Sequence, residues 1–323
     1  MTSATSLFSP VDADLRLLTE NLKQLVGARH PILYAAAEYL FGAGGKRLRP
    51  AIVLLVARAT MSDKEITQKH RRLAEITEMI HTASLVHDDV IDESELRRGV
   101  PTVNSSFGNR VAVLAGDFLF AQSSWYLANL DNLAVVKLLS EVIRDFAEGE
   151  IQQGLNRFDA SLSISAYLEK SYYKTASLMA NSAKASALLS GVSDALAQQL
   201  YEYGRNVGLA FQIVDDILDF TASSDALGKP AGSDLKSGNL TAPVLFAMEE
   251  KPYLETLIER EFAQEGDLEQ ALALVYDSHG IERSRELATK HAQQAIANLS
   301  ELPDSDSRQT LLELCDYVLS RLY

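Results

Sequence analysis

The chain has 323 residues, 47% of them apolar, which is enough for a sizeable core and excludes a disordered chain. Acidic residues outnumber basic ones by 44 to 30, and the net charge of −14 argues against a general nucleic-acid-binding function. A single cysteine excludes an intrachain disulfide, and neither a signal peptide nor an apolar run of ~18 residues is visible. We therefore expect a soluble cytoplasmic protein.

Apolar residues recur with the helical period along almost the whole chain, and the alternation typical of strands is absent. The pattern predicts one all-helical domain over residues 1–323, with residues 1–10 disordered. A capping box, Ser62 to Glu65, predicts the start of the helix that runs into the first acidic cluster. The remaining helices are expected over residues 11–27, 31–42, 50–60, 110–129, 133–157, 164–190, 200–220, 241–250, 253–263, 267–278, 280–299 and 305–321.

Loops rich in glycine and proline interrupt these helices at residues 42–50, 97–109 and 228–243. Each loop carries basic residues, and the second and third directly follow clusters of aspartates. None has the length or low complexity of a linker. We therefore expect the three loops to gather at one end of a single domain.

Two aspartate clusters share the spacing D-D-x-x-D. They are Asp88, Asp89 and Asp92, and Asp215, Asp216 and Asp219. Side chains four residues apart are neighbours on a helix, so the outer aspartates of each cluster could hold one cation, with the middle ones in orienting roles. Carboxylates without cysteine or histidine ligands favour Mg²⁺, which also binds phosphate oxygens. One such cluster would be read as a solvated helix end, but two copies favour a site for metal and diphosphate.

Basic residues accompany these clusters. The segment GGKRLRP supplies Lys46, Arg47 and Arg49 just before a predicted helix, whose backbone N–H groups would add to a diphosphate cradle. Its spacing is not that of a P-loop. The other basic residues of interest are Arg97, Arg98, Lys174 and Lys229.

The face of the helix below the first cluster carries small residues. Ala83 and Ser84 lie about one turn before Asp88, where a bulky side chain would block any groove descending from the acidic end. Ordinary close packing of helices would explain small residues equally well. From the spacing alone, both interpretations stay open.

Together these motifs resemble the trans-isoprenyl diphosphate synthases over nearly the whole chain. The resemblance rests on GGKRLRP, HDDVID followed by RRG, GDFLFAQ, KTASL, FQIVDDILDF and GKPAGSDL, in the order of that family. The segments AGDFLFAQSSWYLANL and GKPAGSDLKSGNLTAPV are similar to the solanesyl diphosphate synthases of cyanobacteria and plastids. The resemblance implies the isoprenoid synthase fold, an all-α helical barrel around a deep central cavity, and a homodimer.

The resemblance also assigns roles by motif. It implies three Mg²⁺ ions per active site on the allylic diphosphate, held by Asp88, Asp92 and Asp215, with Asp219 in support. The residues expected to bind the allylic diphosphate are Arg97, Lys174, Thr175, Gln212 and Lys229. Those expected to bind isopentenyl diphosphate are Lys46, Arg49, His81 and Arg98. The catalytic set would be Asp88, Asp92, Lys174, Asp215 and Lys229.

The implied reaction ionises the allylic C–O bond, joins the allylic carbon to the isopentenyl double bond and then loses a proton. In this family, bulky residues at the positions of Ala83 and Ser84 stop chain growth early, so the small residues here favour a long product. The expected product is solanesyl diphosphate (C45), a precursor of the plastoquinone side chain. We expect peripheral membrane contact when so apolar a product is released.

Three other functions are compatible with parts of this pattern. A geranylgeranyl diphosphate synthase (C20) would need a bulky plug below Ala83 and Ser84 from another helix. A class I terpene cyclase would lack GGKRLRP and a second D-D-x-x-D motif, and both are present. A silent regulatory subunit of a synthase would have lost a metal-binding aspartate or Lys46, and none is lost.

Overall fold

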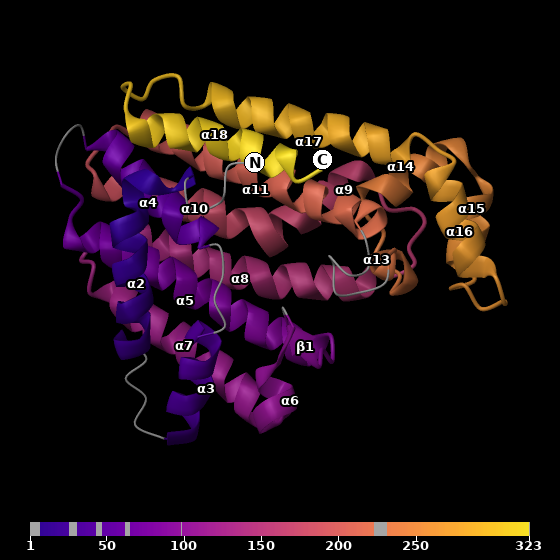
Figure 1. Cartoon of the computed structure of the whole chain (residues 1–323), viewed down its shortest axis with the longest axis horizontal. Coiled ribbons are helices and arrows are strands. Elements are labelled where there is room, and N and C mark those ends of the chain that lie inside the picture. Colours follow the sequence, from indigo (N-terminus) through magenta and orange to yellow (C-terminus); the bar gives the residue numbers. More distant parts are fainter. Residues whose placement is uncertain are drawn as a thin grey trace. The chain divides into compact units, whose positions relative to one another are not determined.

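The computed structural model describes residues 7–25, 31–42, 47–61, 65–97, 99–222 and 231–322, and the account below concerns these residues. They form helices and a single two-stranded hairpin, which confirms the predicted all-α class (Figure 1). The helices are α2 (Asp12–Leu25), α3 (Pro31–Gly42), α4 (Leu48–Thr60), α5 (Gln68–Ile91), α6 (Val103–Phe107), α7 (Asn109–Ala128), α8 (Leu133–Leu155), α9 (Ile164–Ser171), α10 (Ser177–Leu189), α11 (Asp194–Thr221), α13 (Ser233–Lys236), α14 (Ala242–Glu250), α15 (Tyr253–Glu259), α16 (Asp267–Tyr276), α17 (Gly280–Ala297) and α18 (Asp306–Ser320).

Shorter elements punctuate the helices. A 3₁₀ turn, η1 (Ser9–Val11), precedes α2, and a π-helical turn, η2 (Tyr172–Ala176), joins α9 to α10. The strands β1 (Leu96–Arg97) and β2 (Val100–Pro101) pair antiparallel directly after the first acidic cluster. The expected disorder of residues 1–10 is wrong for residues 7–10, because the Phe8 side chain is buried beside η1. Residues 1–6 lie outside the described residues.

The predicted capping box is also wrong. Helix α5 begins at Gln68, and its cap is formed by Thr67 and His70 in place of Ser62 and Glu65. The Thr67 N–H donates to Nδ1 of His70 at 3.3 Å, so the imidazole takes the part that a glutamate usually plays. Burial lowers the pKa of His70, which keeps this nitrogen unprotonated and able to accept.

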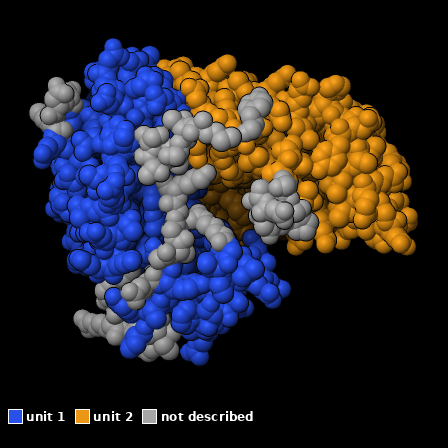
Figure 2. Space-filling view, in the orientation of Figure 1, with its two compact units in different colours: residues 1–143, 178–201, 299–313 blue, residues 144–177, 202–298, 314–323 orange. Residues whose placement is uncertain are grey.

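The described chain divides into two compact units (Figure 2). Unit 1 comprises residues 1–143, 178–201 and 299–313, and unit 2 comprises residues 144–177, 202–298 and 314–323. Each unit is assembled from stretches that are far apart in the sequence, and neither is a continuous segment. The single domain over residues 1–323 stays a prediction.

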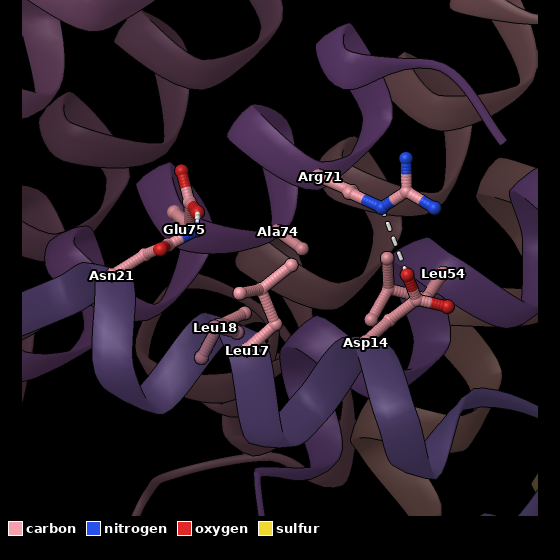
Figure 3. Close-up of a pocket in the computed structure, with 8 residues that line it drawn as sticks. All are labelled: Asp14, Leu17, Leu18, Asn21, Leu54, Arg71, Ala74 and Glu75. Atoms are coloured by element: carbon pink, nitrogen blue, oxygen red, sulfur yellow. Dashed lines mark hydrogen bonds and ion pairs between the residues drawn. The ribbon is translucent and has the colours of Figure 1, made fainter.

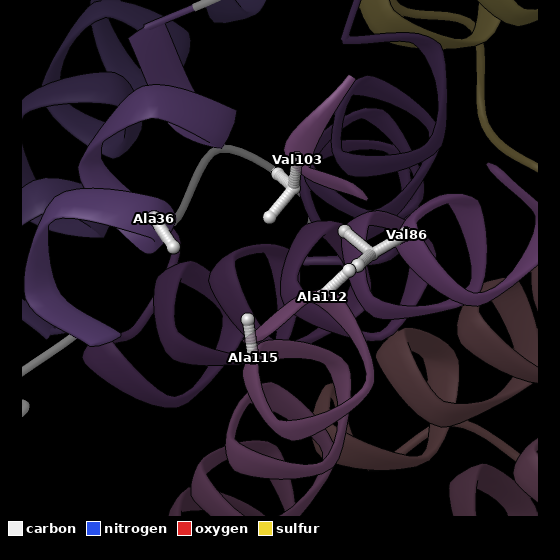
Figure 4. Close-up of a cluster of buried hydrophobic side chains, with 5 residues drawn as sticks. All are labelled: Ala36, Val86, Val103, Ala112 and Ala115. Atoms are coloured by element: carbon white, nitrogen blue, oxygen red, sulfur yellow. The ribbon is translucent and has the colours of Figure 1, made fainter. Parts of the chain in front are cut away.

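Unit 1 is built around α5, which packs against α4 and α7. Small side chains allow α3, α5, α6 and α7 to approach closely, and Figure 4 shows this cluster of Ala36, Val86, Val103, Ala112 and Ala115. Close approach is also required at Gly116 of α7, where an added Cβ would lie 2.2 Å from Nε2 of His87. The His87 ring passes over this glycine to reach the backbone oxygen of Val113 at 3.1 Å. His87 is therefore a packing residue.

A small pocket in unit 1 lies between α2, α4 and α5 (Figure 3). None of the predicted site residues lines it. Its carboxylate Asp14 is held by Arg58 and Arg71 at 2.8 Å each, and Glu75 accepts from Asn21 at 2.7 Å. The charged side chains at this pocket are thus paired with one another or with neighbouring polar groups, which is typical of a structural hollow.

In unit 2, α11 packs tightly against the π-helical turn. At Gly208 an added Cβ would lie 2.6 Å from Cα of Ala176, so only glycine permits this approach. On α18, the thiol of Cys315 is buried beside Tyr203 of α11, and this burial raises the pKa of Cys315 to about 12.

No helix among the described residues is long and apolar enough to cross a membrane.

Candidate active-site residues

The first acidic cluster terminates α5. Asp88 lies in the last turn and Asp92 is the C-cap, with its N–H donating to the Asp88 backbone oxygen at 2.8 Å. The Asp92 side chain is exposed and that of Asp88 is half-buried. Two carboxylates one turn apart at the negative end of a helix dipole repel each other and the helix end. A bound cation would relieve both effects, so the geometry favours cation binding here.

The middle aspartate of this cluster has a separate role. Asp89 is buried, and Nε of Arg97 lies 2.9 Å from each of its carboxylate oxygens, while Nη2 of Arg97 lies 2.7 Å from Oδ1. Asn104 donates to the Asp89 backbone oxygen at 3.3 Å. Asp89 thus anchors Arg97 on β1, and its orienting role toward the outer aspartates stays a prediction. About 36% of the Arg97 side chain stays exposed and can meet an anion.

Two basic side chains meet where α4 starts beside α5. Nη1 of Arg49 lies 3.0 Å from Nε2 of His81, so this nitrogen accepts and the ring is protonated on Nδ1. Arg47 caps α4 with a left-handed backbone (φ 50°), and its guanidinium pairs with buried Glu78. Arg47 therefore ties the start of α4 to α5, which sequence reasoning missed because nothing in GGKRLRP distinguishes its arginines. The predicted ligands Lys46 and Arg98 lie outside the described residues.

The second acidic cluster lies near the end of α11, and its outer aspartates differ. Asp215 is partly exposed and pairs with Arg321, with 2.6 Å between Oδ1 and Nη2. Asp219 is buried and accepts from the Ser233 hydroxyl at 2.9 Å and from the Asp234 N–H at 3.1 Å. Asp219 therefore holds the start of α13, and its contact with metal stays a prediction.

The middle aspartate of this cluster is the centre of a buried network. Asp216 accepts from the Tyr167 hydroxyl at 2.5 Å and from the Gln212 amide at 2.8 Å, and Gln212 in turn accepts from Thr175 at 2.6 Å. Burial raises the pKa of Asp216 to about 7, and the two donated bonds act in the opposite direction. The network ties α9, the π-helical turn and α11 together. Through this network, Thr175 and Gln212 are linked by hydrogen bonds to the second acidic cluster.

Lys174 projects from the π-helical turn, a kind of turn frequent at functional sites. Its Nζ lies 2.8 Å from Oε1 of Glu150 and 3.3 Å from that of Gln153, both on α8. Lys170, one turn earlier, is buried and donates to Asn239 at 2.6 Å, and burial lowers its pKa. Sequence reasoning missed Lys170 because it has the spacing of an ordinary surface lysine. Lys229 lies outside the described residues.

Comparison with known proteins places this chain among enzymes. The polyprenyl synthetase family model matches residues 30–275. The chain belongs to the polyprenyl synthetase family. It is 73% identical to a prenyl transferase from Synechocystis sp. over the full length of both chains, and 57% identical to the chloroplastic solanesyl-diphosphate synthase 2 of Oryza sativa subsp. japonica, covering 99% of this chain and 80% of that one.

A solved structure agrees with these relatives. The polyprenyl synthase from Caulobacter crescentus, complexed with calcium and isoprenyl diphosphate, superimposes with a TM-score of 0.90 at 36% identity, over 99% of this chain and 98% of that one. The predicted family and the isoprenoid synthase fold are thereby confirmed. The chain is a prenyltransferase.

The donor set of this prenyltransferase suits a cation that needs few protein ligands. Among the described residues, no three His, Cys, Asp or Glu side chains form a ready-made metal cluster. Mg²⁺ typically takes one or two carboxylates and completes its shell with water and substrate phosphates. The half-buried Asp88, the exposed Asp92 and the partly exposed Asp215 offer such carboxylates. The residues present therefore fit Mg²⁺ better than a metal that requires a closed protein cage.

The two predicted chain-length residues differ in accessibility. Ala83 is fully buried, whereas Ser84 is partly exposed and donates to the backbone oxygen of His81 at 2.9 Å. A substituent at Ser84 would therefore project into accessible space more readily than one at Ala83. Control of product length by this pair stays a prediction.

Proposed function

We propose that this prenyltransferase condenses an allylic diphosphate with successive isopentenyl diphosphates to a long-chain all-trans polyprenyl diphosphate, and that the product is solanesyl diphosphate (C45). The observation that carries the proposal is the 57% identity, over 99% of the chain, to the rice solanesyl-diphosphate synthase. The small residues Ala83 and Ser84 below the first cluster support a long product. Such a product would serve as a quinone side-chain precursor.

We propose Mg²⁺ as the cofactor, with Asp88, Asp92 and Asp215 as its protein ligands and three ions per active site. When bound, the ions would neutralise the negative charge that develops on the departing diphosphate. Asp219 would support this arrangement indirectly, because its carboxylate fixes the backbone at the start of α13. Asp89 and Asp216, both buried and hydrogen-bonded, would keep the outer aspartates of their clusters in register.

We assign the diphosphate groups to basic residues near each cluster. Arg49 and His81, in contact at 3.0 Å, would bind isopentenyl diphosphate together with Lys46 and Arg98. A neutral His81 protonated on Nδ1 can donate one hydrogen bond, and Arg49 supplies charge for a phosphate oxygen. The residues assigned to the allylic diphosphate are Arg97, Lys174, Thr175, Gln212 and Lys229. Apolar walls would keep water from the carbocation.

We also propose that the protein is a homodimer that uses an apolar face of α7. Val113, Leu114 and Trp125 are exposed on this helix, with 40%, 48% and 61% of each residue accessible. These residues, called here the α7 face, lie within about a third of the helix circumference, given 100° per residue. Asp117, also exposed, lies within the same arc, so the α7 face is apolar only in part. Large apolar side chains exposed together on one arc of a helix are typically covered in the native assembly.

The product assay tests the proposed reaction. Purified protein is incubated with Mg²⁺, labelled isopentenyl diphosphate and either farnesyl or geranylgeranyl diphosphate, and the hydrolysed products are sized by chromatography. A single product near C45 is expected. A C20 product would keep the chemistry and replace the assigned length with that of a geranylgeranyl diphosphate synthase. No product with any primer would overturn the catalytic assignment in favour of a silent subunit.

A further inference from the structure

Arg321 lies in the turn that follows α18, more than a hundred residues after the second acidic cluster in the sequence. Its Nη2 is 2.6 Å from Oδ1 of Asp215, and its guanidinium carbon is 4.6 Å from the centroid of the Phe211 ring. Phe211 and Asp215 are four residues apart on α11 and therefore share a face. Arg321 is thus held by a carboxylate and an aromatic ring from successive turns of one helix.

This pairing is partly shielded from solvent. The Arg321 side chain is 21% exposed and that of Asp215 is 37% exposed, so water screens the pair less than it screens a fully exposed one. Nη1 of Arg321 is buried and donates no hydrogen bond within the described part of the chain. A buried donor without an acceptor is unfavourable, so the ion pair leaves Arg321 incompletely satisfied. Such an arrangement can give way when a stronger cation reaches Asp215.

We propose that Arg321 is an internal counter-ion for Asp215, which neutralises this carboxylate in the metal-free protein and is displaced when a divalent cation binds. The inference rests on the proposed role of Asp215 as a metal ligand. Because the guanidinium and the metal compete for one carboxylate, each weakens binding of the other by the same factor. Arg321 would therefore set the metal concentration at which the second cluster fills.

The test is a titration of the full-length, substrate-free protein with Mn²⁺ alone, in which unbound Mn²⁺ is followed by electron paramagnetic resonance. Arg321→Gln removes the charge and keeps much of the side chain's length. This substitution removes a partly exposed ion pair and its ring contact. Because Asp215 then no longer exchanges arginine for metal, Mn²⁺ is expected to bind about three- to ten-fold more tightly at the sites that depend on Asp215. Arg321→Lys keeps the charge and is expected to stay close to the wild type.

A matched control separates this competition from the general effect of one fewer positive charge. Arg283 has the same two kinds of contact elsewhere in unit 2, an ion pair with Glu249 at 2.7 Å and a guanidinium 4.2 Å from the Phe246 ring centroid. Arg283→Gln therefore removes equivalent interactions at a site without an aspartate cluster. Its Mn²⁺ affinity is expected to match that of the wild type.

Thermal unfolding gives a second measure of the same coupling. Without metal, Arg321→Gln should unfold at a lower temperature than the wild type, and saturating Mn²⁺ should reduce this difference, because bound metal has already displaced the arginine. A purely structural role would lower both unfolding temperatures equally. An equal loss with and without Mn²⁺ would therefore contradict the proposal.

The variant Asp215→Asn distinguishes failure of the inference from failure of the proposed function. If Asp215→Asn leaves Mn²⁺ binding unchanged, Asp215 is no metal ligand and both proposals are overturned. If Asp215→Asn weakens binding while Arg321→Gln leaves it unchanged or weakens it, only the competition is overturned. Weaker binding in Asp215→Asn with tighter binding in Arg321→Gln supports both.

Discussion

Neighbouring aspartates in each cluster have different environments, and this difference divides their roles. Asp89 and Asp216 are buried and hydrogen-bonded by Arg97 and by Tyr167 with Gln212, respectively. The outer residues of the first cluster, by contrast, keep accessible carboxylates. The spacing D-D-x-x-D predicted the outer pairs correctly as neighbours, but spacing cannot reveal burial, so it gave no sign that Asp219 is buried and hydrogen-bonded to Ser233, whereas Asp215 is partly exposed.

Loss of the Asp88 carboxylate tests the metal assignment at the residue scale. Asp88→Ala should lower turnover by about a hundred-fold or more, because charge stabilisation of a leaving group supplies several kcal/mol. Initial rates with Mg²⁺ and labelled isopentenyl diphosphate measure the effect. Glu95→Gln is the matched control, since Glu95 is an exposed acidic residue just past the same cluster and should retain wild-type activity. Near-normal activity of Asp88→Ala would remove Asp88 from the site.

Substitution at Ser84 tests the control of chain length. Ser84→Phe should shift products toward shorter chains, because the larger ring would occupy space that the partly exposed serine leaves open. Ala83→Tyr is expected to shorten products as well, but at the cost of stability, since Ala83 is fully buried and overpacking typically costs about 1–3 kcal/mol. Chromatography of hydrolysed products and urea unfolding of both variants provide the measurements. An unchanged product length in Ser84→Phe would show that this face does not border the growing chain.

His291 on α17 should make the fold sensitive to acid. Its Nδ1 lies 2.8 Å from Oδ1 of Asn206, and burial lowers its pKa to about 4 from the ordinary 6.5. Between these values the unfolded chain binds a proton that the folded protein excludes, so this stabilisation is present above pH 6.5 and is lost as the pH falls toward 4. In the wild type, the free energy of unfolding should fall between pH 6.5 and 4, and His291→Gln should reduce this fall by about 1–3 kcal/mol. Urea unfolding across this pH range measures the effect.

An exposed histidine gives a control of opposite sign. Glu250 raises the pKa of His279, whose stabilising contribution is therefore complete below pH 6.5 and lost as the pH rises through the raised value. His279→Gln should remove the small gain in stability that the wild type shows as the pH falls toward 6.5, and should leave the slope between pH 6.5 and 4 unchanged. Equal slopes in the wild type and His291→Gln would show that His291 does not govern the acid response.

At the scale of elements, most helices could be predicted from periodicity, and the exceptions have physical causes. Helices α3, α7 and α8 match the expected ranges to within two residues, because their apolar patterns are long and regular. The π-helical turn was hidden inside the predicted helix over 164–190, since one extra residue in a turn leaves almost no trace in composition. The hairpin β1–β2 and helices α6 and α13 are too short to produce a period.

Gly208 links two elements through a contact that sequence alone could not reveal. Gly208→Ala should destabilise the protein by about 1–3 kcal/mol, because the new methyl group would meet Ala176 on the π-helical turn at 2.6 Å. The disturbance should also lower activity, since Lys174 lies on the same turn. Urea unfolding and initial rates measure the two effects.

Gly154 of α8 supplies the control for this substitution. An added Cβ there meets nothing within 4 Å, so Gly154→Ala should be neutral or stabilising by up to about 1 kcal/mol. If Gly208→Ala proves as benign as Gly154→Ala, the close approach of α11 to the π-helical turn is less tight than described.

At the scale of the whole molecule, the proposed homodimer is testable through the α7 face. Leu114→Glu and Trp125→Glu place charges where an apolar contact is proposed, and burying an unpaired charge is strongly unfavourable. Sedimentation velocity should show the wild type as a dimer and these variants shifted toward monomer. Tyr253→Glu, at an exposed aromatic residue of α15, should leave the dimer intact. A monomeric wild type at micromolar concentration would contradict the proposal.

The placement of the lone thiol has a practical consequence for studying this enzyme. Only a thiolate reacts readily with alkylating and disulfide reagents. The Cys315 thiol is buried, and burial raises its pKa to about 12, so almost none of it is ionised at neutral pH. The native protein should therefore be unreactive toward maleimides and iodoacetamide without any change to its sequence. If a cysteine is introduced at a chosen surface position, only that residue should take up a spin label or fluorophore. Distances could then be measured during the catalytic cycle on an otherwise wild-type chain.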